Sequence, residues 1–481
     1  MANSLTNKTV TGVFWSGTQR FASLGIQFVI TLIIARILTP EDYGLIGMVT
    51  IFTALGIIML DSGFGQALIR KQDATDEDYS TILFFQIFLG IIIYLILFFA
   101  SPLIAAFFNT PELESISKVV FLILPINSFG MIHLTILRKN VKFKVYAKIT
   151  IISAIISGSI AVTMAYLGLG VWTLVLQMLL QALFVSILLW HFIKWRPKLV
   201  FKIESIKNII LFSSSLLSIG LIKTVSRNIY TLLIGKFHPI AQVGYYNQAK
   251  RFEEIPSQSI TSIIQNVSYP VLSTLQSDDK KLKQGYKKVI TQTMFIILPL
   301  MIILAAIADN LFIVLLTEKW SPSIPLFRIL CAYGILYPLY SINENILKVK
   351  GKGKLLVILE IFKNIILFIS IVLTIKKGVT ILLLGSVITS FISVLINMYF
   401  CGKEISYKIV EQFRDIFSIG IVSVLTAIIV MTLNYLNMSP LITLVMQMLF
   451  SSIIFISLCE IFRISAYSTM KTIIMNKLKR S

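Results

Sequence analysis

Long apolar runs separated by short polar breaks fill most of the 481-residue chain. A helix needs about 20 mostly apolar residues to cross a hydrocarbon core about 30 Å thick. Backbone groups in lipid must be hydrogen-bonded within the spanning structure, and these runs are too long for barrel strands. The pattern therefore predicts an all-α integral membrane protein with about 14 transmembrane helices. The predicted spans are 12–35, 43–68, 79–108, 115–138, 146–168, 171–194, 208–236, 241–270, 287–316, 323–349, 354–376, 379–402, 411–436 and 439–463.

The composition supports a membrane protein. Hydrophobic residues make up 56% of the chain and charged residues 14%, with a mean hydropathy of +0.87. Globular domains are about 45 to 50% apolar. No connecting loop is long enough to hold a soluble domain, so we expect the function to lie within the bilayer or at its faces. The first span lacks the short apolar region and cleavage site of a secretory signal, which predicts an uncleaved first helix.

The basic residues are distributed unevenly between alternate loops. The chain has 43 Lys and Arg and a net charge of +21. About 30 of the basic residues fall in the loops that share a side with the N-terminus, and about 6 in the others. This asymmetry predicts that both termini are cytoplasmic. The basic loops are expected to meet anionic membrane lipids, so nucleic-acid binding is not predicted.

The metal-binding and redox residues are few and scattered. Cys331, Cys401 and Cys459 each lie inside a predicted span, and the chain has only 3 histidines. No disulfide framework or metal-ligand cluster is recognisable. We therefore predict no metal site and no cofactor.

One short stretch occurs twice. Residues 32–47 read LIIARILTPEDYGLIG, and residues 232–247 read LLIGKFHPIAQVGYYN. An even number of spans separates the copies, so both halves enter the membrane from the same side. This is the parallel type of repeat, related by an axis along the membrane normal. It predicts two six-helix bundles, 1–200 and 201–405, followed by two additional transmembrane helices and a tail in 406–481.

Two blocks of the sequence resemble a known family. Residues 32–70 resemble the signature of the bacterial polysaccharide transporters, the Wzx-like O-antigen and exopolysaccharide repeat-unit flippases of the multidrug/oligosaccharidyl-lipid/polysaccharide exporter superfamily. Residues 231–273 are similar to the family's second repeated region. The residues that carry the resemblance are Leu38, Pro40, Asp42, Gly44, Asp61, Gly63 and Ala67 in the first block and Gly244, Tyr246, Ala249, Pro256 and Pro270 in the second.

This resemblance implies a flippase. Such a protein moves an undecaprenyl-pyrophosphate-linked oligosaccharide from the cytoplasmic to the periplasmic leaflet of the bacterial inner membrane by alternating access. Its partners are the lipid-linked substrate, membrane lipids and other polysaccharide-assembly proteins. A coupling ion, H⁺ or Na⁺, stays open.

Basic residues inside the predicted spans are the candidate substrate contacts. A sugar chain and a pyrophosphate cannot cross hydrocarbon without polar partners, and charges inside spans usually mark a functional path. Arg20 and Arg227 have no carboxylate three or four residues away. Internal ion pairs are the alternative, because Lys250 and Glu254 have helix-neighbour spacing. The candidate substrate-binding residues are Arg20, Lys223, Arg227, Lys250 and Arg251.

Three acids inside spans are candidates for ion coupling. Glu344 lies between two asparagines and is the best placed of them. Asp61 has a structural alternative, in which its carboxylate binds backbone amides where the helix loosens. Glu360 has another, a pair with Lys363.

Two other functions stay open. A multidrug-and-toxin-type cation-coupled exporter shares the superfamily, but usually has about twelve spans and an acid-rich cavity. A polyprenyl-sugar polymerase or ligase is the enzymatic alternative, since Asp76 to Asp78 spells the D-x-D of metal-dependent glycosyltransferases. No nucleotide-binding domain surrounds that motif and no large periplasmic loop is predicted, so we assign no catalytic residue.

The charge asymmetry makes a topological prediction. Reporter fusions after Lys202 and at the C-terminus should behave as cytoplasmic, because the basic loops stay inside. Fusions near Asn109 and Asn437 should behave as periplasmic. A periplasmic reporter at the C-terminus would mean an odd number of spans, and would contradict the parallel repeat.

Overall fold

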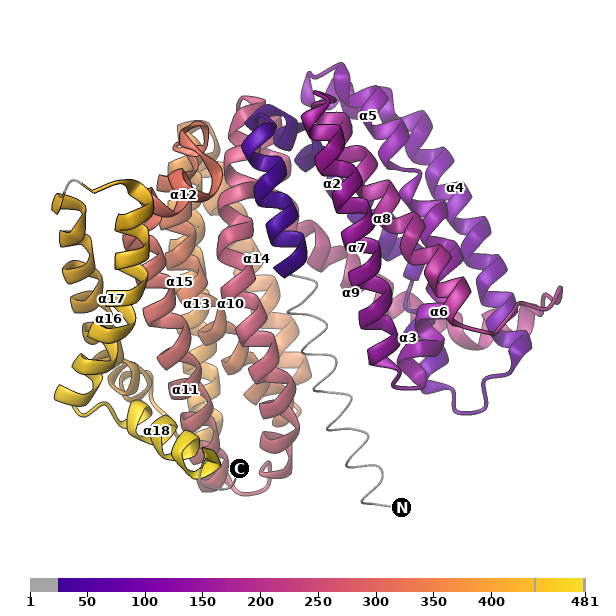
Figure 1. Cartoon of the computed structure of the whole chain (residues 1–481). Helices are drawn as coiled ribbons and strands as arrows, with labels where there is room; N and C mark the ends of the chain where they lie inside the picture. The colour runs from indigo at the N-terminus through magenta and orange to yellow at the C-terminus, as the bar shows by residue number, and fades with distance from the viewer. Residues whose placement is uncertain (1–24, 437, 479–481) are drawn as a thin grey trace. The chain divides into compact units, whose positions relative to one another are not determined.

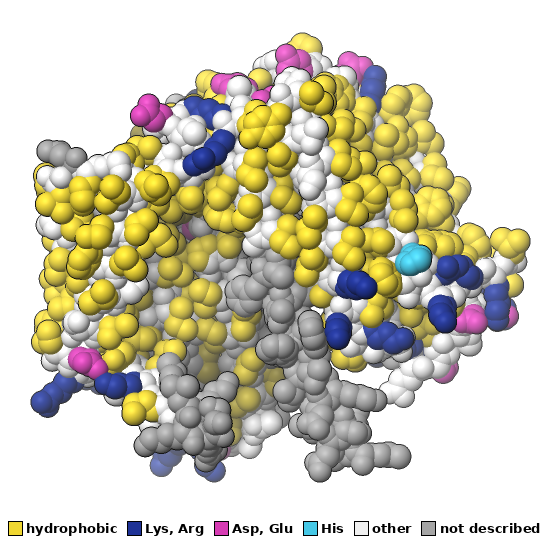
Figure 2. Space-filling view, in the orientation of Figure 1, with side chains coloured by type: hydrophobic (Ala, Val, Ile, Leu, Met, Phe, Trp, Pro, Cys, Tyr) yellow, Lys and Arg dark blue, Asp and Glu magenta, His cyan; other side chains and the backbone are white. Residues whose placement is uncertain are grey.

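Long helices make up most of the chain (Figure 1). The computed structural model describes residues 25–436 and 438–478, and every regular element in these ranges is a helix. Within them, 11 helices are long and apolar enough to cross a membrane. Figure 2 shows hydrophobic side chains over much of the visible face and basic side chains in separate patches. The prediction of an all-helical, multi-span membrane protein is confirmed.

The chain packs as two compact units, Met1–Gly244 and Tyr245–Ser481. The first holds most of the helices before the second repeated stretch. Its elements are the segment Gly25–Ile37, α2 (Pro40–Asp61), α3 (Phe64–Arg70), α4 (Asp76–Phe108), α5 (Glu112–Val120), α6 (Ile123–Lys139), α7 (Phe143–Tyr166), α8 (Val171–Phe192), α9 (Ile203–Phe237) and the start of α10 (Ile240–Thr274).

Two helices of the first unit begin with the same capping arrangement. At α2 the Thr39 side chain accepts a hydrogen bond from the Asp42 backbone, and the Asp42 carboxylate accepts one from the Thr39 backbone at 2.9 Å. Thr75 and Asp78 repeat this capping box at the start of α4. Each box satisfies backbone donors that have no partner inside the helix. Asp42, part of the family resemblance, therefore has a local structural reason to be where it is.

The two repeated stretches pack against each other inside the first unit. A Cβ on Gly44 would overlap the carbonyl oxygen of Ile240, and a Cβ on Gly244 would overlap that of Pro40. In the repeat, Gly244 corresponds to Gly44 and Ile240 corresponds to Pro40. The two contacts are therefore equivalent, with the two stretches exchanged. Gly235 also lies close to Met48, where α9 packs along α2. Only glycine lets backbones approach this closely.

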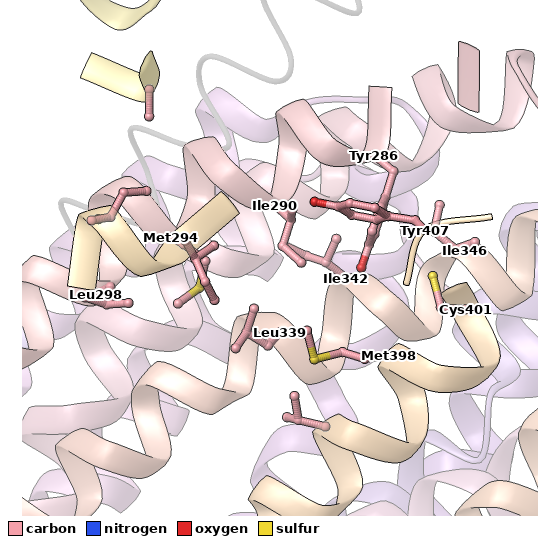
Figure 3. Close-up of a cluster of buried hydrophobic side chains, with 14 of the residues drawn as sticks. Tyr286, Ile290, Met294, Leu298, Leu339, Ile342, Ile346, Met398, Cys401 and Tyr407 are labelled. Atoms are coloured by element: carbon pink, nitrogen blue, oxygen red, sulfur yellow. The ribbon is translucent and has the colours of Figure 1, made fainter. Parts of the chain in front are cut away.

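The second unit is built around α11, α13 and α15. Figure 3 shows Tyr286, Ile290, Met294, Ile342 and Met398 among the side chains that these helices direct toward one another. The hydroxyl of Tyr407, just after α15, donates to Asp415, and burial beside this carboxylate raises the pKa of Tyr407. The elements are the rest of α10, α11 (Asp279–Ala306), α12 (Ala308–Leu316), η1 (Glu318–Trp320), α13 (Ser323–Val349), α14 (Gly353–Thr374), η2 (Ile375–Lys377), α15 (Val379–Ile405), α16 (Ile409–Met431), η3 (Thr432–Leu436), α17 (Pro440–Ile461) and α18 (Ser465–Leu478).

The last spanning helices are attached to the second unit by polar as well as apolar contacts. Helix α16 packs along α11, and α17 packs on α16 and α12. The Asn310 amide donates to Asn434 at 2.9 Å and to Gln447 at 3.0 Å. Gln447 is fully buried and donates to Asn434 in turn. This carboxamide cluster satisfies polar groups that would otherwise be buried without partners.

Most predicted spans correspond to observed helices, but the count of 14 is not reproduced by apolar helices alone. The range 323–349 coincides with α13, and 115–138 is divided into α5 and α6 by a break at Phe121 and Leu122. Helices α9 and α10 are 35 residues each and are not among the 11 candidate spans. Only part of 12–35 lies within the described residues. The bundle boundaries 1–200, 201–405 and 406–481 stay a prediction.

The glycine contact can be tested by adding a single methyl group. Gly44→Ala and Gly244→Ala should each lower the thermal unfolding temperature of the purified protein, because overpacking against a backbone carbonyl costs about 1–3 kcal/mol. Gly420→Ala on α16 is the matched control, since a Cβ there meets nothing within 4 Å. Unfolding temperatures that match the control would contradict the close approach of the two stretches.

Candidate functional site

Two basic residues of the first unit lie on one side of α9. Lys223 and Arg227 are both exposed and lie one helical turn apart, so they share a face. The side-chain amide of Asn228, beside Arg227, donates to the carbonyl of Thr224 at 2.9 Å. Arg20 lies outside the described residues. Of the predicted substrate contacts in this unit, the structure therefore brings together Lys223 and Arg227.

The remaining predicted substrate contacts lie on α10 in the second unit. The Lys250 ammonium is 3.9 Å from the Glu254 carboxylate and 5.8 Å from the centre of the Tyr246 ring. Gln258 donates to the same Glu254 carboxylate at 3.1 Å. Arg251, next in the chain, is half-buried. The helix-neighbour pair expected as the alternative for Lys250 is thus present. A cavity shared by Arg20, Arg227 and Arg251 stays a prediction.

A buried carboxylate that the sequence did not single out lies one turn away. Glu253 is 1% exposed and accepts a hydrogen bond from the Ser257 hydroxyl. Gly334 of α13 lies directly against it, since a Cβ there would come 2.5 Å from a Glu253 carboxylate oxygen. The glycine therefore makes room for the acid between the two helices. No local sequence signal pairs Gly334 with Glu253, because they are 81 positions apart in the chain.

A polar cluster joins α13, α14 and α15. The Lys363 side chain is 5% exposed and forms an ion pair with Glu360. Its ammonium also donates to Asn397 at 3.2 Å and lies 4.4 Å from the centre of the Tyr340 ring. The Tyr340 hydroxyl donates to Glu360 at 2.6 Å. The pair predicted for Glu360 and Lys363 is present, together with two partners that the sequence did not suggest.

One side of α13 is polar along much of its length. We call Tyr333, Tyr337, Tyr340, Ser341, Glu344 and Lys348 the α13 polar face. They recur at three- and four-residue spacings and are all partly or fully exposed, whereas the opposite side of the helix packs in the core. Glu344 forms an ion pair with Lys348 at 2.8 Å. Gln265 of α10 donates to Ser341, which continues the polar surface onto that helix.

The Asp61 carboxylate lies where the second helix ends. Helix α2 stops at Asp61, and Ser62 and Gly63 both adopt positive φ before α3 begins. The carboxylate interacts with the backbone of Gly65 and with the charge of Arg138. This geometry favours the structural alternative for Asp61. The coupling roles of Asp61, Glu344 and Glu360 all stay predictions.

Both acids of the D-x-D motif bind other side chains of the first unit. Asp76 accepts a hydrogen bond from the Trp195 indole at 3.1 Å and faces the Lys198 ammonium at 3.3 Å. Asp78 accepts from Lys71 at 2.8 Å and from Ser205 at 2.7 Å, in addition to its capping bonds. These contacts tie the connection between α8 and α9 to the start of α4. These contacts give both acids a structural role that requires no bound metal or nucleotide.

Lys202 also links the connection between α8 and α9 to the start of α4. Its ammonium binds Glu77, and this hydrogen bond raises the pKa of Lys202. Its backbone N–H donates to Thr81 at 3.1 Å. Within the described residues, no group of three or more His, Cys, Asp or Glu side chains is placed to hold a metal ion.

Comparison with known proteins identifies a family. Residues 33–325 match the model of a family described as polysaccharide biosynthesis protein. The chain is 28% identical over 355 residues to the teichuronic acid biosynthesis protein TuaB of Bacillus subtilis (strain 168), covering 73% of each chain. It is 26% identical over 341 residues to the succinoglycan biosynthesis transport protein ExoT of Rhizobium meliloti (strain 1021), covering 70% of this chain and 69% of the relative.

Solved structures show the same fold. The inward closed conformation of the lipid II flippase MurJ superposes with a TM-score of 0.72 at 16% identity, covering 93% of this chain and 98% of MurJ. An inward-facing multidrug resistance transporter of the MATE family, from the MOP superfamily, superposes with a TM-score of 0.62 at 15% identity, covering 80% and 98%. At these identities the likeness establishes the fold only.

The cluster around Lys363 makes a prediction about stability. Lys363→Met should lower the free energy of unfolding by about 1–3 kcal/mol, since it leaves Glu360 without its cation. The loss should fall below that for a fully buried pair because the Glu360 side chain is 39% exposed. Lys348→Met is the control, from a more exposed pair. Thermal unfolding of both variants and of the Lys363→Met, Glu360→Gln double variant measures this. Additive losses in the double variant would show that the pair is not coupled.

Proposed function

Because the chain belongs to the polysaccharide biosynthesis protein family, we propose that it flips a lipid-linked oligosaccharide across the bacterial inner membrane, from the cytoplasmic to the periplasmic leaflet. The chain is a transporter and not an enzyme. Its relatives include one named as a transport protein for succinoglycan biosynthesis, and its fold is that of a lipid II flippase. The substrate is an oligosaccharide on undecaprenyl pyrophosphate.

The observation that best supports this function is the polar surface of the second unit. The candidate spans α13 and α14 carry Ser341, Glu344 and Glu360, and Gln265 of α10 donates to Ser341. Ionisable groups at such depth almost always face a bundle interior or a water-filled path. A sugar chain needs such a path, because its hydroxyls lose their water in hydrocarbon.

The family and the fold support an architecture of about 14 helices. The segment Gly25–Ile37 and the long helices α9 and α10 complete the 11 candidate spans to about 14. They form two six-helix halves and two additional helices, with both termini in the cytoplasm. The halves alternate between inward and outward access around the substrate. The reciprocal contact at Gly44 and Gly244 supports a two-fold relation between them.

The basic residues hold the anionic part of the substrate. Arg20, Arg227 and Arg251, with Lys223 and Lys250, bind the pyrophosphate or acidic sugars. A guanidinium offers two parallel donors to phosphate oxygens, which lysine does not reproduce. Glu344, Asp61 and Glu360 are the candidates for binding a coupling H⁺ or Na⁺. Other polysaccharide-assembly proteins receive the flipped substrate.

A multidrug exporter is the second candidate, and the shared MATE fold favours it. Cationic drugs are attracted to acids that lack a cation of their own. In the second unit Glu254, Glu344 and Glu360 each have a lysine within 4 Å. This pairing makes an anionic or neutral substrate the better fit.

Arginine substitutions test the substrate contacts. Arg20→Ala or Arg227→Ala should abolish surface polysaccharide at unchanged protein level, and Arg→Lys at either site should restore it only in part. Arg328→Ala is the matched control, because this arginine already pairs with Asp309. Polysaccharide on the cell surface and protein in the membrane are measured together. Full output from the Arg20→Ala, Arg227→Ala double variant would refute these contacts.

A further inference from the structure

We infer that the α13 polar face is a carbohydrate-binding surface, on which sugar rings of the substrate stack against Tyr333 and Tyr337. This inference rests on the proposed function and adds which part of the substrate is recognised in the second unit. The basic residues hold the charged end, and the tyrosines hold the sugars. The surface sets which oligosaccharide is accepted.

The side chains of the α13 polar face suit contact with water and not contact with lipid. From Tyr333 to Lys348 the face runs about 22 Å along the helix, at about 1.5 Å per residue. It carries two charges and a row of hydroxyl groups over that length. The neighbouring α14 has the opposite character, with Val357, Ile361 and Phe368 all more than half exposed. Such apolar side chains suit hydrocarbon, and the α13 residues do not.

The chemistry of the face matches that of a sugar. A sugar ring has flat patches of C–H bonds surrounded by hydroxyl groups. A tyrosine ring can cover such an apolar patch with its face. Tyr333 and Tyr337 are four residues apart, about 6 Å along the axis. Farther along the same surface lie the Glu344 carboxylate, which can accept hydrogen bonds from sugar hydroxyls, and the Gln265 carboxamide, which can donate and accept them.

Part of the surface is held in place before any substrate arrives. The Tyr340 hydroxyl is fixed by Glu360, while its backbone carbonyl accepts from Asn397 at 3.2 Å. Lys363 lies against the same ring. Ser341 is fixed by Gln265 from α10. A surface whose side chains are already positioned loses less conformational entropy when a ligand binds.

The charges agree with a sugar ligand. Glu344 pairs with Lys348 and Glu360 with Lys363, so neither carboxylate is left without a cation. A cationic ligand therefore finds no uncompensated acid on this face. Neutral and acidic sugars bind through hydroxyl groups and ring faces, which do not require one.

Binding measurements with two lipids separate the sugar from its carrier. The purified full-length protein in lipid nanodiscs is titrated with polyprenyl pyrophosphate that carries no sugar, and with the lipid-linked repeat unit extracted from the host strain. Tyr333→Leu, Tyr337→Leu should weaken binding of the repeat unit about tenfold, because ring stacking is lost. Binding of the bare polyprenyl pyrophosphate should not change. Each single leucine variant should show about a threefold loss, which keeps the test valid if the double variant folds poorly.

The controls separate stacking from general damage. The double phenylalanine variant, Tyr333→Phe, Tyr337→Phe, keeps the rings and should bind the repeat unit within about threefold of the unaltered protein. Tyr399→Leu on α15 removes an equally large tyrosine that is 56% exposed and lies outside the face. It should leave both affinities unchanged.

Two results would overturn the inference. One is an equal loss for both lipids in the leucine variants, which would assign the face to the carrier or to the fold. The other is no loss for either lipid. If the unaltered protein binds the repeat unit no better than the bare carrier, sugar recognition is absent. If it binds neither lipid, the proposed function fails as well.

Discussion

Hydrocarbon does not solvate charges, and this constraint decides where each polar side chain of this protein can lie. A charged group inside a span costs at least about 2.5–3.5 kcal/mol unless it finds a partner or water. The second unit meets the constraint by pairing, as in Lys363 with Glu360 and Lys250 with Glu254. One side of α13 also carries several polar groups that lie away from the core. The polar path needed for transport is therefore compatible with a stable membrane bundle.

The same constraint separates the helices into two kinds. Helix α14 is apolar around most of its surface and suits lipid. Helices α9 and α10 are as long as the longest spans, but each contains several charged or amide side chains. A polar helix of that length persists in a membrane only where protein or water surrounds its polar side. The second repeated stretch begins at the end of α9 and ends at the start of α10, and the two helices carry four of the predicted substrate contacts.

Much of the fold could be predicted because spanning helices leave a strong local signal. The run 323–349 was enough to define α13, and Pro40 and Asp42 mark the start of α2 through its cap. The local pairs of Lys363 and Lys250 also followed from helical spacing. The contacts of Asn397 with Lys363 and of Gly334 with Glu253 join distant parts of the chain. One sequence holds no signal for such contacts, because packing alone brings these residues together.

The central claim is that the α13 polar face lines a water-filled path. Thiol labelling in intact membranes tests it directly, against the low background of the buried Cys331, Cys401 and Cys459. A charged, water-soluble thiol reagent should label Tyr337→Cys and Ser341→Cys but not Ile361→Cys or Phe368→Cys of α14. A lipid-permeable reagent provides the control for thiol reactivity. Labelling of the α14 positions by the charged reagent, with the α13 positions protected from it, would contradict the account.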